Sequence, residues 1–132
     1  MLTPHYEIEV DPRLSLLHIT LGGFFSLTDV DRLITDRNIA MKRLTCGPNQ
    51  HVTLVDVSGC KLQSQDVVGA FMKAIVDPRS LSRRLAFVTE SSLARMQVRR
   101  MVTREGTALF ENVSDAKAWL LTGDVVAQAM TG

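Results

Sequence analysis

The residues able to bind a metal ion are few in this chain. Its nitrogen ligands are three histidines, His5, His18 and His51. All three fall on expected strands, and no carboxylate or thiolate lies at the spacing that a tetrahedral zinc site needs. We therefore predict no metal site and interpret the histidines as ordinary strand residues.

Nucleophilic chemistry is also poorly supported by the residue pattern. Cys60 follows an expected strand, but a nucleophile needs a base within hydrogen-bond reach and no histidine is expected at a neighbouring carboxyl-terminal strand end. An inert thiol is therefore favoured over an activated one. Gly22-Gly23 is a turn and not a phosphate loop, since neither Lys-Ser/Thr nor a third glycine follows. We predict no catalytic site and no cofactor.

The clearest charge cluster lies between residues 79 and 104. That segment has a single acid, Glu90, and seven arginines: Arg79, Arg83, Arg84, Arg95, Arg99, Arg100 and Arg104. One interpretation is a solvated helix face and loop. The alternative is a docking surface for an acidic partner, a phosphate or nucleic acid, because the arginine fork recognises such groups. Nucleic acid is disfavoured, since only Phe87 and Phe110 lie near the cluster to stack on bases.

Length and composition indicate one globular domain. The chain has 132 residues, of which 45% are hydrophobic and 22% charged. No run approaches the roughly 18 apolar residues of a membrane helix, and the N-terminus MLTPHYEIEV lacks the features of a signal peptide. Two cysteines outside a CxxC motif favour reduced thiols and a cytoplasmic location. We expect a domain over residues 1–121 and a tail over 122–132.

Hydrophobic periodicity predicts an N-terminal β-hairpin. Residues 5–10 alternate apolar and polar side chains, as in a half-buried strand. Residues 14–21 form a second strand, and the short turn at Asp11-Pro12-Arg13 makes the pair antiparallel.

Helices and strands are then expected to alternate. The helices are expected at 27–44, 64–76, 91–104 and from the cap Ser114, and the strands at 51–57, 84–89 and 107–111, with Ser58-Gly59 closing the first of these strands. This order implies an α/β fold in which a mixed five-stranded sheet with right-handed crossovers carries four helices. The helix at 64–76 is apolar around most of its circumference and is expected to pack deeply. The helix at 91–104 is expected to turn Leu93, Met96, Val98, Met101 and Val102 inward and its arginines mostly outward.

The element order and two segments, VTLVDVSGCKLQSQDVVGAF and ALFENVSDAKAWL, resemble the SpoIIAA-like proteins. These proteins share the STAS fold of anti-sigma-factor antagonists and sulfate-transporter tails. The resemblance covers roughly residues 5–121 and lies in element order and hydrophobic pattern. It implies a bacterial, non-catalytic regulatory module that binds other proteins.

Antagonists of this type are switched by phosphorylation of a serine in an Asp-Ser-Ser-Gly turn. The matching stretch here places Gln65 at the switch position, between Ser64 and Asp66, so the resemblance implies that the switch is not retained. If the alignment shifts by a residue, Ser58 or Ser64 takes that role, since a phosphate at either would meet free backbone N–H groups. Otherwise Ser58 closes a turn and Ser64 caps a helix.

Two functions of different classes stay open. The first is a protein-interaction module that uses the face between the second and third helices. Its expected partner-binding residues are Arg95, Met96, Arg99 and Arg100, facing an acidic protein partner. The second is a small-ligand or lipid-binding domain, because some relatives of the STAS fold resemble lipid carriers and the 64–76 helix could line a cavity. Neither function requires membrane insertion, and the exposed hairpin edge makes a weak homodimer possible.

Overall fold

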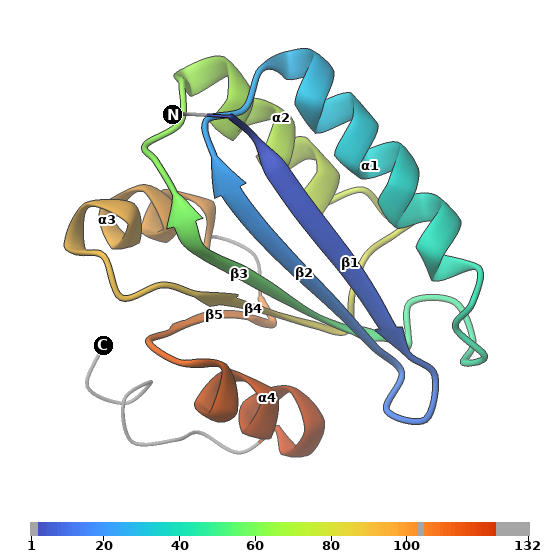
Figure 1. Ribbon diagram of the computed structural model, residues 1–132. Coiled ribbons are helices and arrows are strands. Elements are labelled where there is room, and N and C mark those ends of the chain that lie inside the picture. The colour runs from blue at the N-terminus through green and yellow to red at the C-terminus, as the bar shows by residue number, and fades with distance from the viewer. Residues whose placement is uncertain (1–2, 103–104, 124–132) are drawn as a thin grey trace.

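The expected element order is found in the computed structural model, which describes residues 3–102 and 105–123. The strands of the described chain are β1 (His5–Asp11), β2 (Leu16–Gly23), β3 (Val52–Cys60), β4 (Arg84–Val88) and β5 (Thr107–Phe110). Its helices are α1 (Leu27–Met41), α2 (Gln65–Ile75), α3 (Ser92–Met101) and α4 (Val113–Thr122) (Figure 1).

The five strands form one mixed sheet in the order β1-β2-β3-β4-β5. The β1–β2 hairpin is antiparallel, and each later pair is parallel. Because right-handed crossovers that advance in one direction put their helices on the same face, α1, α2 and α3 share one side of the sheet. The chain then crosses the edge after β5, and α4 covers the opposite side (Figure 1). The predicted α/β architecture is confirmed.

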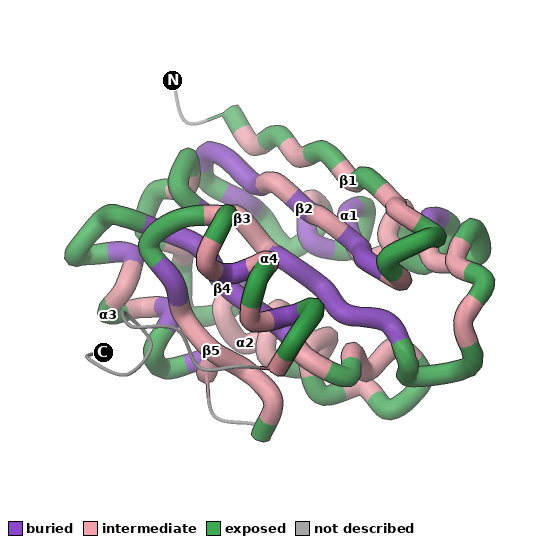
Figure 2. The backbone as a smooth tube through the Cα atoms, turned by 90° about the horizontal axis from the view of Figure 1, so that it is seen from below, coloured by how far each residue is buried: buried purple, intermediate pink, exposed green. Residues whose placement is uncertain are grey.

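Strand alternation gives the sheet two separate apolar layers. On the α4 side the buried residues are Leu16, Val52, Leu54, Ala86, Val88, Phe110, Ala116 and Leu120. On the other side Leu17, Ile19, Leu21, Val57, Leu85 and Phe87 meet α1, α2 and α3. Figure 2 shows the edge strand β1 alternating between exposed and half-buried residues, while β3 has a continuous buried stretch. The centre of the sheet is thus covered on both faces.

The helix expected at 27–44 ends at Met41, and two further predicted boundaries are wrong. Ser58-Gly59 does not end β3, because Gly59 still pairs with Gly22 and Cys60 with Gly23. Ser114 does not cap α4; the cap is Asn112, whose side chain accepts a hydrogen bond from the Asp115 N–H at 2.8 Å. An asparagine side chain satisfies the free N–H groups of a first turn as well as serine does.

Residue 122, expected to belong to the tail, lies in α4. Thr122 is the last residue of α4, and Gly123 ends that helix in the left-handed conformation with φ of 76°. Residues 124–132 of the expected tail, and residues 103–104 of the helix expected at 91–104, lie outside the described residues.

The predicted orientation of α3 is wrong for two of its residues. Leu93 and Met96 are 62% and 64% exposed. The residues that face the sheet are Ala94, Val98 and Met101, which recur at the i, i+4, i+7 spacing of one helix face. Ser91 fixes this phase, because its side chain accepts the Ala94 N–H and starts the helix there.

Candidate functional site

An apolar cavity of about 110 Å³ lies beneath α2, between that helix and the sheet. Its floor comes from β3 and β4, through Val55, Leu85 and Phe87, and its roof comes from Val68, Phe71, Ala74 and Ile75 of α2. Of the α2 residues only Val67 is fully buried, so the deep packing expected of this helix is wrong. The helix instead packs beside α1, and a small side chain at Ala74 leaves volume above the strands.

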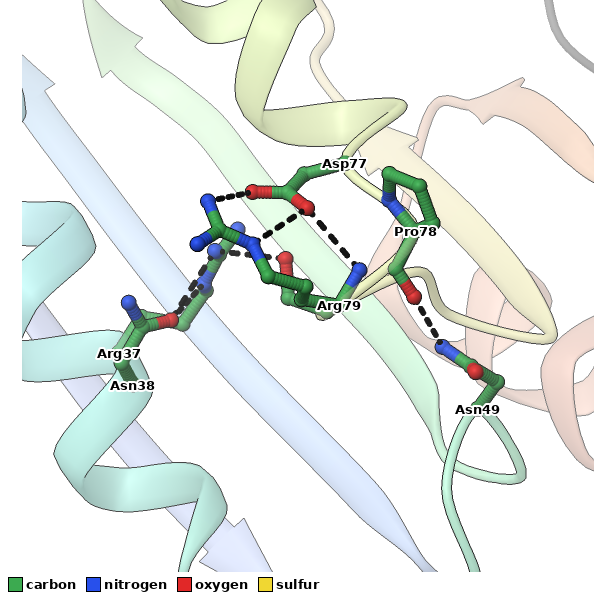
Figure 3. Close-up of polar contacts among 7 residues, drawn as sticks. Arg37, Asn38, Asn49, Asp77, Pro78 and Arg79 are labelled. Carbon is green, nitrogen blue, oxygen red and sulfur yellow. Dashed lines mark hydrogen bonds and ion pairs between the residues drawn. The ribbon is translucent and has the colours of Figure 1, made fainter.

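Polar side chains gather at one end of the cavity, where β3 and β4 begin. Arg37 reaches this end from α1, and its Nη2 donates to Ser80 Oγ at 2.9 Å and to Asn38 Oδ1 at 3.1 Å (Figure 3). His51 is 3% exposed and lies 3.2 Å from the Ser82 hydroxyl through Nε2. No single segment of the sequence marks this group, since its members come from α1, the residue before β3 and the α2–β4 loop.

Burial controls the charges at this end. It lowers the pKa of Arg37, although the nearby Asp77 carboxylate acts in the opposite direction. Burial, followed by the charge of Arg37, lowers the pKa of His51, so that imidazole is neutral at pH 7. Asp77 is itself bound to Arg79 at 2.9 Å, and those hydrogen bonds lower its pKa to about 2 (Figure 3). None of the ion pairs among the described residues includes Arg37.

Gln63 closes the opposite end of the cavity. Its side chain accepts the Phe25 N–H at 2.8 Å and donates to the Gly23 carbonyl at 3.0 Å. Its backbone exchanges two hydrogen bonds, both 2.9 Å long, with the side-chain amide of Gln97 on α3. One residue therefore fixes the end of β2, the β3–α2 loop and α3 to each other. The sequence analysis missed both glutamines.

Two solved structures resemble this arrangement over almost the whole chain. One is an uncharacterised protein of the DUF3478 family with a SpoIIAA-like fold from Shewanella loihica, with a TM-score of 0.66 and 18% identity over 89% of this chain and 93% of that one. The chain has a SpoIIAA-like fold. The other is an anti-sigma factor antagonist from Mycobacterium paratuberculosis, with a TM-score of 0.64 and 8% identity over 89% of this chain and 94% of that one. No protein-family model and no curated protein matches the chain.

The three residues of the expected switch loop occupy different positions in the SpoIIAA-like fold. Ser58 is an exposed residue inside β3, and its N–H donates to Asp56 Oδ1 at 3.0 Å. Ser64 is the N-cap of α2, where its hydroxyl accepts the Val67 N–H at 3.2 Å. Asp66 is exposed in the first turn of that helix, next to Gln65. Ser64 and Asp66 are thus neighbours, while Ser58 belongs to the sheet.

The expected partner-binding residues divide into two groups on α3. Arg95 is 27% exposed and forms a 2.7 Å ion pair with Glu111 after β5. Met96, Arg99 and Arg100 are exposed. Leu93, Met96 and Arg100 follow the i, i+3, i+7 spacing and so share one helix face. Arg95 instead holds α3 against the end of β5.

The cavity is lined by one cysteine, Cys60, whose thiol is the candidate for metal or redox chemistry there. Burial raises the pKa of this thiol to about 12, so the sulfur is protonated and unreactive at neutral pH. Within the described ranges, no group of three or more His, Cys, Asp or Glu residues is placed to hold a metal ion. Across the same residues, no helix is long and apolar enough to cross a membrane.

Proposed function

We propose that this chain is a non-catalytic regulatory module of the bacterial cytoplasm that binds an acidic protein partner. The proposed contact region, called here the α3 surface, consists of Leu62, Leu93, Met96, Arg99 and Arg100. The observation that carries the proposal is the exposure of its three apolar members, which are 48%, 62% and 64% exposed.

Several properties of the α3 surface support a role in protein binding. Gathered apolar side chains on a small domain are characteristic of interaction sites, and methionine and arginine are enriched in interfaces. Arg99 and Arg100 add two exposed positive charges, which favour and orient an acidic partner. The Gln63–Gln97 hydrogen bonds hold Leu62 and α3 in a fixed relation, which lowers the entropy lost on binding.

The proposal includes loss of the phosphorylation switch. Gln65 stands where the resemblance implies a serine, and its amide accepts no phosphate. The neighbouring Ser64 hydroxyl is engaged as a helix cap. We expect the partner to bind independently of phosphorylation. Replacement of Ser64 by Ala or Asp should therefore change the affinity of the domain for its partner by no more than the small effect of altering one helix cap.

The α3 surface can be tested by photocrosslinking in cells of the source organism. A photoreactive phenylalanine analogue at position 96 should form one dominant protein adduct. The double charge reversal Arg99→Glu/Arg100→Glu should remove that adduct, because an acidic partner is then repelled. The matched control Lys42→Glu/Arg43→Glu changes two exposed bases beyond the end of α1 and should leave the adduct intact. Equal crosslinking in both double variants would disprove the proposal.

The cavity supports a second candidate function, the binding of a small ligand. Protein interiors are close-packed, and an apolar void of this size beneath a half-buried helix departs from that rule. A lipid or other small molecule would occupy a space that the side chains leave open. This function and partner binding use different parts of the fold.

A further inference from the structure

We infer that the cavity beneath α2 binds a small organic monoanion, whose compact apolar body fills the space under Ala74 while its anionic group contacts the Arg37 guanidinium. This inference rests on the second candidate function, ligand binding, and is independent of the α3 surface.

The volume and lining of the cavity define the apolar body of the ligand. A cavity of about 150 Å³ lined by aliphatic and aromatic side chains stays dry and binds benzene. The present cavity, at about 110 Å³, is of the same order and is lined by Leu85, Phe87, Val68 and Phe71. A short acyl chain of about five or six carbon atoms matches this space, whereas a long-chain lipid exceeds it.

The charge at the polar end defines the head group. A half-buried guanidinium is stabilised when an anion pairs with it, and desolvation without such a pair is costly. Asp77 is the nearby carboxylate, but Arg79 binds it. The guanidinium of Arg37 donates through Nε and Nη2 only, and no described residue accepts a hydrogen bond from Nη1.

The groups around Arg37 favour a ligand whose head group carries one negative charge. His51 is neutral at pH 7 and contributes no second cation. Ser80 lines the same end, and its hydroxyl, which accepts from Arg37 Nη2, can donate its own hydrogen to a carboxylate without adding charge. A single guanidinium with an adjacent hydroxyl favours a monocarboxylate over a dianionic phosphate.

The binding of hexanoate, monitored through backbone amide NMR shifts of the intact protein, tests this inference. The uncharged 1-hexanol serves as the matched probe. Hexanoate should bind at least tenfold more tightly than hexanol, because a charge-assisted hydrogen bond is added. Shifts should concentrate at residues of α2 and at Ser80. If the wild type shows no shifts at millimolar hexanoate, or binds hexanol equally well, the inference is wrong.

Two variants separate the head-group site from the cavity. Arg37→Met keeps an unbranched apolar stem but removes the guanidinium, and it should weaken hexanoate binding at least tenfold without affecting hexanol. Ala74→Leu fills the cavity and should abolish binding of both probes, whereas the exposed Lys73→Met is a neutral control. Undiminished hexanoate binding in Arg37→Met or Ala74→Leu would overturn the assignment. If Arg37→Met does not fold, Ala74→Leu and the hexanol comparison still decide the question.

The outcome for the α3 surface is measured separately. Photocrosslinking at position 96, repeated in the Ala74→Leu background, should be unchanged. The expected result for a ligand specific to the cavity is that Ala74→Leu loses hexanoate binding but retains crosslinking at position 96. Failure of hexanoate to bind the wild type, with crosslinking retained, would disprove only the ligand and leave the proposed protein interaction standing.

Discussion

The two faces of the sheet are packed to different degrees. On the α4 side, Leu54, Phe110 and Leu120 are at most 1% exposed, and the Phe110 and Trp119 rings lie 5.5 Å apart. On the side of α1, α2 and α3, the cavity remains open beneath a helix with one fully buried residue, Val67. The single helix α4 packs closely on the central strands that it covers, while three helices leave a void on the other face.

This contrast indicates a division of roles within one domain. Close packing on the α4 side supplies dispersion and hydrophobic stabilisation to the central strands. The α2 side can then retain unfilled volume without unfolding the chain. Sites that bind ligands or partners are commonly drawn from the less stable parts of a protein. The cavity and the expected switch residue Ser64 both belong to α2 or its cap.

Truncation of one phenylalanine on each face gives the largest expected effect. Phe110→Ala should lower the free energy of unfolding by about 3–5 kcal/mol, as expected for a fully buried aromatic residue. Phe71→Ala should cost less than about 3 kcal/mol, because Phe71 is half-buried beside an existing cavity. Urea denaturation of both variants measures the difference.

The value for Phe71 also tests how loosely α2 packs on the sheet. Phe71 meets Phe25 edge to face, with centroids 6.0 Å apart, so some loss is expected. A cost equal to that of Phe110→Ala would mean that both faces are equally well packed, and the division of roles would be wrong.

A smaller effect is expected from glycines on the two faces. Gly69 lies inside α2, and a Cβ built there meets no neighbouring atom within 4 Å. Gly69→Ala should therefore stabilise the protein by about 0.5–1 kcal/mol, through the reduced backbone entropy of the unfolded chain. Thermal unfolding followed by circular dichroism measures the change.

Gly123, which ends α4, is the contrasting position. Its φ is 76°, and a Cβ would lie 2.5 Å from Arg84 Nη2. Gly123→Ala should be destabilising by about 1 kcal/mol or more, since alanine strains this conformation. A stabilising Gly123→Ala, or a destabilising Gly69→Ala, would contradict the packing described for the respective face.

The sequence predicts the elements of this fold better than its site. The hairpin and the alternating helices carry period-2 and helical patterns within single segments, so local reasoning is sufficient to find them. The prediction of which α3 residues face the sheet is wrong because Leu93 and Met96 are apolar yet exposed. Hydrophobicity alone does not determine the rotation of a helix about its axis. The cavity cannot be predicted from the sequence, because unfilled space between several elements leaves no pattern in any single segment.

The polar groups around the cavity escape prediction for a related reason. Arg37 meets Ser80 across 43 positions of sequence, and Gln63 meets Gln97 across 34. No motif spacing marks such pairs, and each residue alone is typical of an exposed helix or loop. The resemblance to SpoIIAA-like proteins implies the fold, but its switch motif marks Ser58 and Ser64 and carries no information on Arg37.

The smallest expected effect is a pH dependence that originates on the cavity side. His51 is buried there, and burial with the charge of Arg37 lowers its pKa. Between that lowered value and the usual pKa of about 6.5, the unfolded chain binds more protons than the folded one. The free energy of unfolding should therefore fall as pH drops below about 6.5, and the contribution is complete above it.

Urea denaturation of wild type and of His51→Gln at several pH values between about 7.5 and 5.5 isolates this contribution. The variant should lose less stability than the wild type over that interval, whatever its stability at pH 7.5. Identical slopes in wild type and His51→Gln would show that the imidazole titrates alike in both states. The polar end of the cavity would then be accessible to water, and the low-dielectric setting assigned to Arg37 would be wrong.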